Sequence, residues 1–223
     1  MGFIVAIDGP AGTGKGTITK LVSEELGLIN IDTGAMYRCV TLDMIKKNIT
    51  LDDIENIEKL LNTIKIDMNE KNGIIQVFLN DEDVTKEIRT APVNNLVSQV
   101  SHIPCVRTNM VNIQRKMAEG KKVVMEGRDI GTNVFPHADV KIYLDATTEE
   151  RASRRYKQEL EKGIETTYEE VLKNVIYRDE NDKNSTVAPL KKADDAVLVD
   201  TTKLTISEVK DAVLKIIREK MNA

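Results

Sequence analysis

The stretch Gly9-Pro10-Ala11-Gly12-Thr13-Gly14-Lys15-Gly16-Thr17 decides the fold of this chain. It lies between an apolar run at residues 3–7 and a helical pattern that begins at Ile18. A strand, a glycine-rich turn and a helix in this order form the setting of a phosphate-binding loop. The glycines let the backbone curl around one anion, and the N-terminus of the following helix adds a partial positive charge at the same place. The stretch therefore predicts a site for phosphate groups.

The spacing Gly9-x-x-x-x-Gly14-Lys15 matches the general phosphate-loop pattern, in which the lysine reaches the terminal phosphates. One position departs from the pattern. Gly16 stands where a serine or threonine commonly ligates magnesium, and Thr17 follows one residue later. The alternative is an ordinary glycine-rich turn between a strand and a helix, but the flanking strand and helix patterns favour the phosphate loop.

Length and composition restrict the class of protein. The chain has 223 residues, enough for one α/β domain with insertions or for two small domains. A formal net charge of −4 and an aromatic content of 4% argue against a nucleic-acid polymer as partner. No apolar stretch approaches the length of a membrane span, and no secretory signal precedes the loop. We therefore expect a cytoplasmic protein with no membrane partner, and we expect a monomer.

Five short apolar runs predict the strands of a parallel sheet: residues 3–7, 28–31, 122–125, 140–144 and 196–199. Their continuous hydrophobicity indicates burial on both faces, and helical patterns lie between most of them. The last of these helices follows a capping box, Thr205-x-x-Glu208. Each run ends at or near an acidic residue. Ligands of such sheets bind beyond the carboxyl ends of the strands, where the loop and these acids fall.

A first insertion interrupts this rhythm at about residues 50–89. Thr50 is expected to cap a helix that carries apolar residues from Ile54 to Ile64, after which the apolar period changes to two. Asn72-Gly73 is a strong hairpin-turn signal, and residues 80–83 predict a second turn. The pattern indicates an antiparallel hairpin or meander, which serves either as a decorative insertion or as a substrate-side subdomain.

A second stretch that interrupts the rhythm covers about residues 147–185 and is highly charged. Its arginines and lysines alternate with acids, as on a pair of solvated helices. In a protein that handles phosphates, the same stretch is a candidate cationic lid.

Charged residues at separated points of the sequence converge on one edge of the predicted sheet. Phosphoryl transfer requires two phosphates held in line and their charge neutralised. Arg38 follows the second predicted strand, and Glu126, Arg128 and Asp129 follow the third. The arginines of the 151–155 segment follow the fourth. Each residue alone is explained as a solvated surface charge, but together they indicate a phosphotransfer site.

Taken together, the motifs of this sequence resemble those of a known family. The Gly-Lys-Gly-Thr form of the loop is similar to that of nucleoside monophosphate kinases, and the other motifs resemble bacterial cytidylate kinases. These motifs are Asp8-Gly9-Pro10, Asp32-Thr33-Gly34-Ala35-Met36-Tyr37-Arg38, Glu87-Ile88-Arg89-Thr90, Ser98-Gln99-Val100-Ser101, Pro104-Cys105-Val106-Arg107, Gly127-Arg128-Asp129-Ile130-Gly131-Thr132, Glu150-Arg151-Ala152-Ser153-Arg154-Arg155 and Ala188-Pro189-Leu190. They cover essentially the whole chain in order.

The resemblance implies a three-layer α/β fold of the P-loop kinase type with a five-stranded parallel sheet. An antiparallel hairpin or meander is inserted on the side that binds the nucleoside monophosphate, and a helical lid is added. The chain would form one domain over residues 1–223. Its core would comprise about 1–40, 90–150 and 187–223, with the monophosphate-binding insertion at about 50–89 and the lid at about 150–186.

The resemblance also implies the reaction, which is transfer of a phosphoryl group from ATP to CMP or dCMP in the presence of Mg²⁺. Lys15, Arg128, Arg151 and Arg155 would be catalytic. ATP would contact Gly9, Pro10, Ala11, Gly12, Thr13, Gly14, Lys15, Gly16, Thr17 and Arg154. CMP would contact Thr33, Arg38, Ser98, Arg107, Arg128, Asp129, Arg178 and Asp182. Thr17 and Glu126 would hold the metal, partly through water.

One position departs from the family pattern. The family's Arg-Asp-x-x-Asp segment, here Arg178 to Asp182, is usually followed three residues later by another arginine. The residue at that position in this chain is Ser185. A cation that contacts phosphate is therefore missing, or it is supplied by Lys183 or Lys191.

The chemistry of cytosine agrees with the residues assigned to the base. Cytosine offers an amino donor at N4 and acceptors at N3 and O2. Asp129 can accept from the amino group, and Arg107 and Ser98 can donate to the acceptors. Uracil reverses this pattern, which would leave a buried carboxylate unpaired at a cost of about 1–3 kcal/mol.

Three alternatives remain at the level of sequence. The chain could phosphorylate another small acceptor, such as UMP, AMP or a hydroxylated metabolite. It could be a nucleotide-dependent switch. Guanine recognition in such proteins uses an Asn-Lys-x-Asp segment, and the most similar stretch here, Asn181-Asp182-Lys183-Asn184, does not match it. It could also retain the fold without activity, in view of Ser185.

Overall fold

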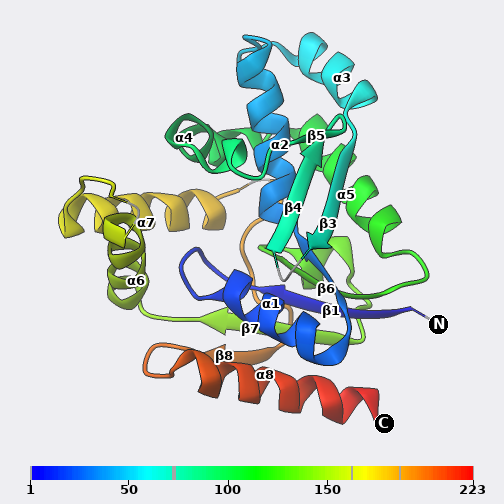
Figure 1. The fold of residues 1–223 in the computed structure, drawn as a ribbon, viewed down its shortest axis with the longest axis vertical. Coiled ribbons are helices and arrows are strands. Elements are labelled where there is room, and N and C mark those ends of the chain that lie inside the picture. Colours follow the sequence, from blue (N-terminus) through cyan, green and yellow to red (C-terminus); the bar gives the residue numbers. More distant parts are fainter. Residues whose placement is uncertain (1, 72–73, 162, 186, 223) are drawn as a thin grey trace. The chain divides into compact units, whose positions relative to one another are not determined.

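A computed structural model describes residues 2–71, 74–161, 163–185 and 187–222 (Figure 1). The helices and strands follow in the order β1 (Phe3–Asp8), α1 (Lys15–Leu26), β2 (Ile29–Asp32), α2 (Thr33–Lys46), α3 (Ile54–Thr63), β3 (Ile66–Lys71), β4 (Ile74–Leu79), β5 (Glu82–Asp83), η1 (Glu87–Arg89), α4 (Ala91–Val100), α5 (Pro104–Ala118), β6 (Lys122–Gly127), η2 (Ile130–Val134), β7 (Val140–Asp145), α6 (Thr148–Glu161), α7 (Tyr168–Lys183), β8 (Val197–Asp200) and α8 (Ile206–Met221).

The chain forms two compact units. The first unit comprises Met1–Asn30 and Gly120–Ala223, and the second comprises Ile31–Glu119.

The first unit is built on a five-stranded sheet with the order β2-β6-β1-β7-β8. β1 pairs in parallel with β6 and with β7, and β7 pairs in parallel with β8. Every predicted apolar run forms one of these strands, so the predicted α/β class and five-stranded parallel sheet are confirmed. The central strand β1 leads into the glycine-rich loop. The next strand in sequence, β2, lies beyond β6, whereas β7 lies on the other side of β1. The loop therefore leaves the sheet where the strand order reverses, which is the usual ligand position in such folds.

Helices α1 and α8 cover one face of this sheet. Ile18 and Val22 of α1 and Val213 and Ile217 of α8 share an apolar core with strand residues such as Ile142. The predicted capping box of α8 is confirmed, since the Thr205 hydroxyl accepts from the Glu208 amide and the Glu208 carboxylate accepts from the Thr205 amide. The cap and the core together fix the helix that closes this face.

The charged stretch forms two helices, as predicted. Ala152 of α6 packs against Val171 and Val175 of α7 in a small apolar cluster of its own. α7 begins at a second capping box, formed by Thr167 and Glu170. Apolar contacts thus help to hold the two helices together.

The second unit contains α2, α3, α4 and α5 with a small sheet of order β3-β4-β5. β3 and β4 are antiparallel, with Ile66 opposite Leu79. The predicted antiparallel insertion is therefore confirmed. The predicted Asn72-Gly73 turn lies outside the described residues.

One local prediction in this insertion was wrong. The cap of α3 is Asp53 and not Thr50, because the Asp53 carboxylate accepts from the Asn56 amide at 3.2 Å. The second predicted turn is present but shorter than predicted. Asn80 and Asp81 make it with positive φ angles of 50° and 70°, and Glu82–Asp83 already form strand β5.

Within the described ranges, no helix combines the length and the apolar character needed to cross a lipid bilayer.

Candidate active site

The glycine-rich loop follows β1 and requires glycine at two of its positions. Gly9 has a φ of 146°, and a Cβ there would lie 2.0 Å from the Leu144 carbonyl oxygen of β7. Gly14 has a φ of 90° and caps the N-terminus of α1. Only a residue without a side chain adopts these conformations at little cost. The loop therefore wraps tightly over the end of the sheet and presents the first turn of α1, as the sequence predicted.

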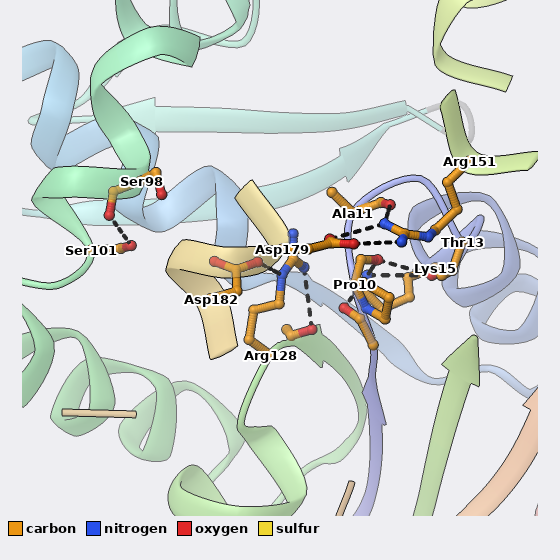
Figure 2. A network of polar contacts seen from close by, with 12 residues as sticks. Pro10, Ala11, Thr13, Lys15, Ser98, Ser101, Arg128, Arg151, Asp179 and Asp182 are labelled. Atoms are coloured by element: carbon orange, nitrogen blue, oxygen red, sulfur yellow. Dashed lines mark hydrogen bonds and ion pairs between the residues drawn. The ribbon is translucent and has the colours of Figure 1, made fainter. Parts of the chain in front are cut away.

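Lys15 is buried at the centre of this loop. Its Nζ atom donates to the carbonyl oxygens of Gly9 and Pro10, both at 2.7 Å (Figure 2). Burial and the nearby charge of Arg128 lower the pKa of Lys15 to about 7, although the carboxylates of Glu126 and Asp8 oppose this shift. A lysine in such surroundings gains from any additional anion, because a negative charge stabilises its protonated form. The site is thus suited to phosphate.

Asp8 connects the start of the loop to the segment after β6. Its buried carboxylate accepts from the amides of Ile130 at 2.8 Å and Gly131 at 2.7 Å. Burial raises the pKa of Asp8 to about 6, although the two amide donors lower it. The carboxylate therefore fixes the backbone directly after Arg128 and Asp129. Sequence reasoning assigned no role to Asp8, although the residue stood in a quoted motif.

The departure at Gly16 has a structural reason. A Cβ at Gly16 would lie 3.1 Å from the Oε1 atom of Glu126, at the end of β6. The buried Thr19 hydroxyl is 3.5 Å from the same oxygen. The glycine thus leaves room for a carboxylate beside the first turn of α1, where Thr17 is exposed.

The donor set at this place suits magnesium held mainly by other ligands. Among the residues that the structure describes, no group of three or more His, Cys, Asp or Glu side chains forms a metal cluster. Thr17 and Glu126 supply oxygen ligands, which Mg²⁺ prefers. Mg²⁺ is commonly bound by one or two protein carboxylates together with phosphates and waters. The residues present fit that mode.

Arg128 and Asp129 follow β6 and lie in different surroundings. The Nε atom of Arg128 donates to Asp182 of α7 at 2.8 Å. Burial lowers the pKa of Arg128, but the carboxylates of Asp182 and Glu126 outweigh burial and raise it overall. Asp129 is buried, and its Oδ2 atom accepts from Asn133 at 2.9 Å. The structure thus brings Arg128 and Asp182 together, as two predicted site residues on separate elements.

The arginines of α6 differ in how many of their guanidinium N–H donors are bonded to other groups of the protein. Arg151 is enclosed and pairs with Asp179 of α7. The guanidinium of Arg154 donates to the hydroxyl and carbonyl oxygens of Thr201, at 3.0 and 2.6 Å. Arg155 is half-buried and donates from Nε to Glu159, one turn along the same helix. Arg178 lies half-buried on α7, directly before Asp179.

The remaining predicted residues belong to the second unit. Thr33 is buried at the start of α2, and the Nε atom of Arg38 donates to Asn94 of α4 at 3.4 Å. Arg107 of α5 stacks over the ring of Tyr37, 5.4 Å from its centroid.

Ser98 lies on α4, and its carbonyl oxygen accepts from the Ser101 hydroxyl (Figure 2). Within the second unit, Arg38 therefore contacts α4, and Arg107 contacts α2.

The predicted site is divided between the units. The loop, Glu126, Arg128, Asp129, the arginines of α6 and the acids of α7 belong to the first, and Thr33, Arg38, Ser98 and Arg107 to the second. Four residues that shape these sites were missed as site residues: Asp8, Tyr37, Asp179 and Thr201. The first three stood within or beside quoted motifs, whereas no sequence signal pointed to Thr201.

Comparisons with known proteins agree along the whole chain. The family model for cytidylate kinase matches residues 5–219. A cytidylate kinase of Fusobacterium nucleatum is 52% identical over 207 residues, which cover 93% of this chain and 93% of that protein. A cytidylate kinase of Ligilactobacillus salivarius is 48% identical over 216 residues, 97% of this chain and 96% of that one.

Among solved structures, an uncharacterized protein from Eubacterium ventriosum matches with a TM-score of 0.53 and 12% identity, over 97% of this chain and 98% of that chain. At this identity the likeness concerns the fold alone.

Proposed function

Because the chain belongs to the cytidylate kinase family, we propose that it transfers the γ-phosphoryl group of ATP to CMP or dCMP. The products are ADP and CDP or dCDP. One observation carries the proposal. A buried lysine in a glycine-rich loop at the sheet's switch point lies near the charges of Arg128 and Glu126, at the end of the neighbouring strand β6.

ATP is proposed to bind at the glycine-rich loop of the first unit. The amides of the loop and of the first turn of α1 suit the phosphates, and Lys15 adds a positive charge. Lys15 must then exchange its bonds to the Gly9 and Pro10 carbonyls for bonds to phosphate oxygens. Arg155 has Nη donors beyond its Nε bond to Glu159, and these suit the developing charge on the transferred group.

The residues proposed for CMP are those that the family motifs assign to it. Arg38 and Arg128 suit the phosphate, because guanidinium groups bind phosphate oxygens in a two-pronged manner. Thr33, Ser98, Arg107 and Asp129 are assigned to the cytosine.

The sugar is assigned to Arg178 and Asp182. The buried carboxylate of Asp129 favours a base with an amino donor, which is the basis proposed for choosing cytosine over uracil.

The reaction needs little covalent help from the protein. An oxygen of the CMP phosphate attacks the γ-phosphorus of ATP, and the bond between that phosphorus and the β-phosphate oxygen breaks. The leaving ADP takes the bonding electron pair. The attacking oxygen is already an anion, so no general base is required. Positioning of the two phosphates and neutralisation of their charge supply the rate.

Magnesium is proposed to bind beside Thr17 and Glu126. When bound, it would neutralise phosphate charge and help to orient the donor. The part of the protein is to provide a hydroxyl and a carboxylate at the N-terminus of α1. The absence of a side chain at Gly16 leaves room for that carboxylate.

A coupled assay of ADP formation with ATP and Mg²⁺ tests the proposal. CMP, dCMP, UMP and AMP are each offered as acceptor, and a reaction without acceptor measures ATP hydrolysis. We expect kcat/KM for CMP and dCMP to exceed that for UMP and AMP by about tenfold or more. A preference for UMP or AMP would show that the proposed acceptor is wrong. ATP binding without any phosphoryl transfer would favour a nucleotide-dependent switch.

A further inference from the structure

The guanidinium group of Arg151 has all five of its N–H donors occupied by the protein. Nε donates to the Ala146 carbonyl at 3.0 Å, and Nη1 donates to the Ala11 carbonyl at 3.1 Å and to Asp179 Oδ1 at 3.0 Å. Nη2 donates to the Thr148 hydroxyl at 3.1 Å and to Asp179 Oδ2 at 2.5 Å (Figure 2). Because arginine has five such donors, none is left for a phosphate oxygen.

Both charged groups of this pair are enclosed. Arg151 is 3% exposed and Asp179 is 8% exposed. Removing one partner of a buried ion pair leaves the other charge without compensation, so the pair tolerates little displacement. The two-pronged geometry also fixes the orientation of the guanidinium plane against the carboxylate. α6 and α7 are therefore held in one register at this point.

The third element in this contact is the crown of the phosphate loop, which we define as Ala11 and Gly12. The Ala11 carbonyl accepts from Arg151, and a Cβ at Gly12 would lie 3.0 Å from the Cβ of Arg151. The crown thus rests directly on the first turn of α6. Because the peptide group is planar and trans, holding the Ala11 carbonyl also fixes the direction of the Gly12 N–H, which points to the opposite side.

We propose that Arg151 and Asp179 are positioning residues that hold the crown of the phosphate loop in its phosphate-binding shape. This inference rests on the proposed phosphoryl transfer and deepens it. It changes the role expected for Arg151, which acts on ATP through the loop and not by direct contact. It also gives Asp179 a role in donor binding. Arg155 differs from Arg151 because its guanidinium pairs only with Glu159 among the described residues, so its Nη donors are left to contact a phosphate.

Two substitutions and their combination test the clamp. Asp179→Asn keeps the shape but removes the charge, and Arg151→Lys keeps the charge but removes the fork. We expect each to lower kcat by about 10- to 100-fold and to raise KM for ATP, while KM for CMP stays within about twofold. The double variant should be no worse than the poorer single variant, because both changes break one contact.

The matched control is Asp43→Asn. Asp43 is also a buried carboxylate, 5% exposed, and it pairs with Lys47 within the second unit. We expect this control to keep kcat and both KM values within about twofold of the wild type. Circular dichroism monitors folding of every variant. If Arg151→Lys does not fold, Asp179→Asn and Thr148→Val test the inference in its place. Thr148→Val removes one acceptor of the Arg151 guanidinium and should raise KM for ATP by about two- to fivefold.

Direct binding of a fluorescent ATP analogue separates this inference from the proposed function. Weaker analogue binding by Asp179→Asn, relative to wild type and Asp43→Asn, supports the clamp whatever the acceptor is. If Asp179→Asn keeps wild-type kcat and ATP affinity while Arg151→Lys loses activity, Arg151 contacts phosphate directly and the inference is overturned. If the wild type binds ATP but phosphorylates neither CMP nor dCMP, the proposed function fails and the clamp does not.

Discussion

At the scale of single residues, the Lys15 ammonium is the cation that the glycine-rich loop itself holds in place. It is buried, donates to two carbonyl oxygens of its own loop, and lies near the charges of Arg128, Glu126 and Asp8. Lys15→Met keeps most of the volume and removes the charge. We expect kcat to fall by about 10²- to 10³-fold or more, because a cation at the transferring phosphate is lost. Near-normal turnover in the coupled assay would contradict the role given to Lys15.

The same residue predicts a dependence of stability on pH. Folding lowers the pKa of Lys15 from 10.5 to about 7. Between these values the unfolded chain holds a proton that the folded chain has released, so this group makes the wild type more stable as pH rises. Lys15→Met lacks the titration. We expect its advantage in free energy of unfolding to be largest at about pH 6 and to shrink by on the order of 2 kcal/mol by about pH 9. Urea unfolding of both proteins at these pH values measures the difference, and a constant difference would refute the assignment.

Asp129 is the residue on which base selection is expected to depend. Its carboxylate is buried, and one oxygen accepts from Asn133. Facing uracil, the carboxylate would receive no hydrogen bond from the base, at a cost of about 1–3 kcal/mol. We therefore expect Asp129→Ala to lower the ratio of kcat/KM for CMP to that for UMP by about tenfold. The ratio is measured with both acceptors at fixed ATP. If it does not change, Asp129 does not read the base.

At the scale of elements, the packing of α1 against the end of β6 explains why the loop carries glycine at position 16. The Glu126 carboxylate occupies the space that a side chain would need. Gly16→Ala should crowd this carboxylate and lower kcat by about tenfold. The same change should not destabilise the fold. Alanine in place of glycine within a helix lowers the conformational entropy of the unfolded chain, which stabilises the folded state by about 0.4–1 kcal/mol.

A compensating change tests this explanation. Glu126→Asp withdraws the carboxylate by one methylene, so Gly16→Ala combined with Glu126→Asp should be more active than Gly16→Ala alone. Steady-state kinetics and thermal unfolding of the three variants measure the effect. A combined variant that loses the product of the two single losses would show that the residues act independently.

Elements could be predicted from the sequence where one local pattern dominated. Residues 3–7 and 140–144 are apolar without interruption, and they form β1 and β7 within one residue of the predicted ends. Thr205 and Glu208 predicted the start of α8 because a capping box uses only neighbouring backbone. The cap of α3 could not be settled in this way. Thr50 and Asp53 are both good capping residues, and only the conformation of the preceding turn selects Asp53.

At the scale of the whole molecule, the roles that escaped prediction depend on contacts between distant parts of the chain. Asp8 bonds amides 122 and 123 residues away, and Arg151 meets Ala11 across 140 residues. A sequence motif shows that such residues are charged and near a strand end. It does not show that the donors of Arg151 are used up inside the protein. Only the tertiary structure distinguishes a residue that binds phosphate from a positioning residue.

The division into two compact units predicts how each nucleotide changes the protein. The donor site is assigned to the first unit, and most contacts to cytosine are assigned to the second. Binding at about 100 times Kd stabilises the bound form by about 2.7 kcal/mol, which slows hydrogen exchange in segments that open only in the unbound form. We expect ADP to protect the loop at residues 9–17 and the start of α6. CMP should protect α2, α4 and the start of α5, together with residues 128–129. Exchange followed by mass spectrometry with each nucleotide alone makes the comparison. If ADP protects α2 and α4 as strongly as CMP does, the assignment of most cytosine contacts to the second unit is wrong.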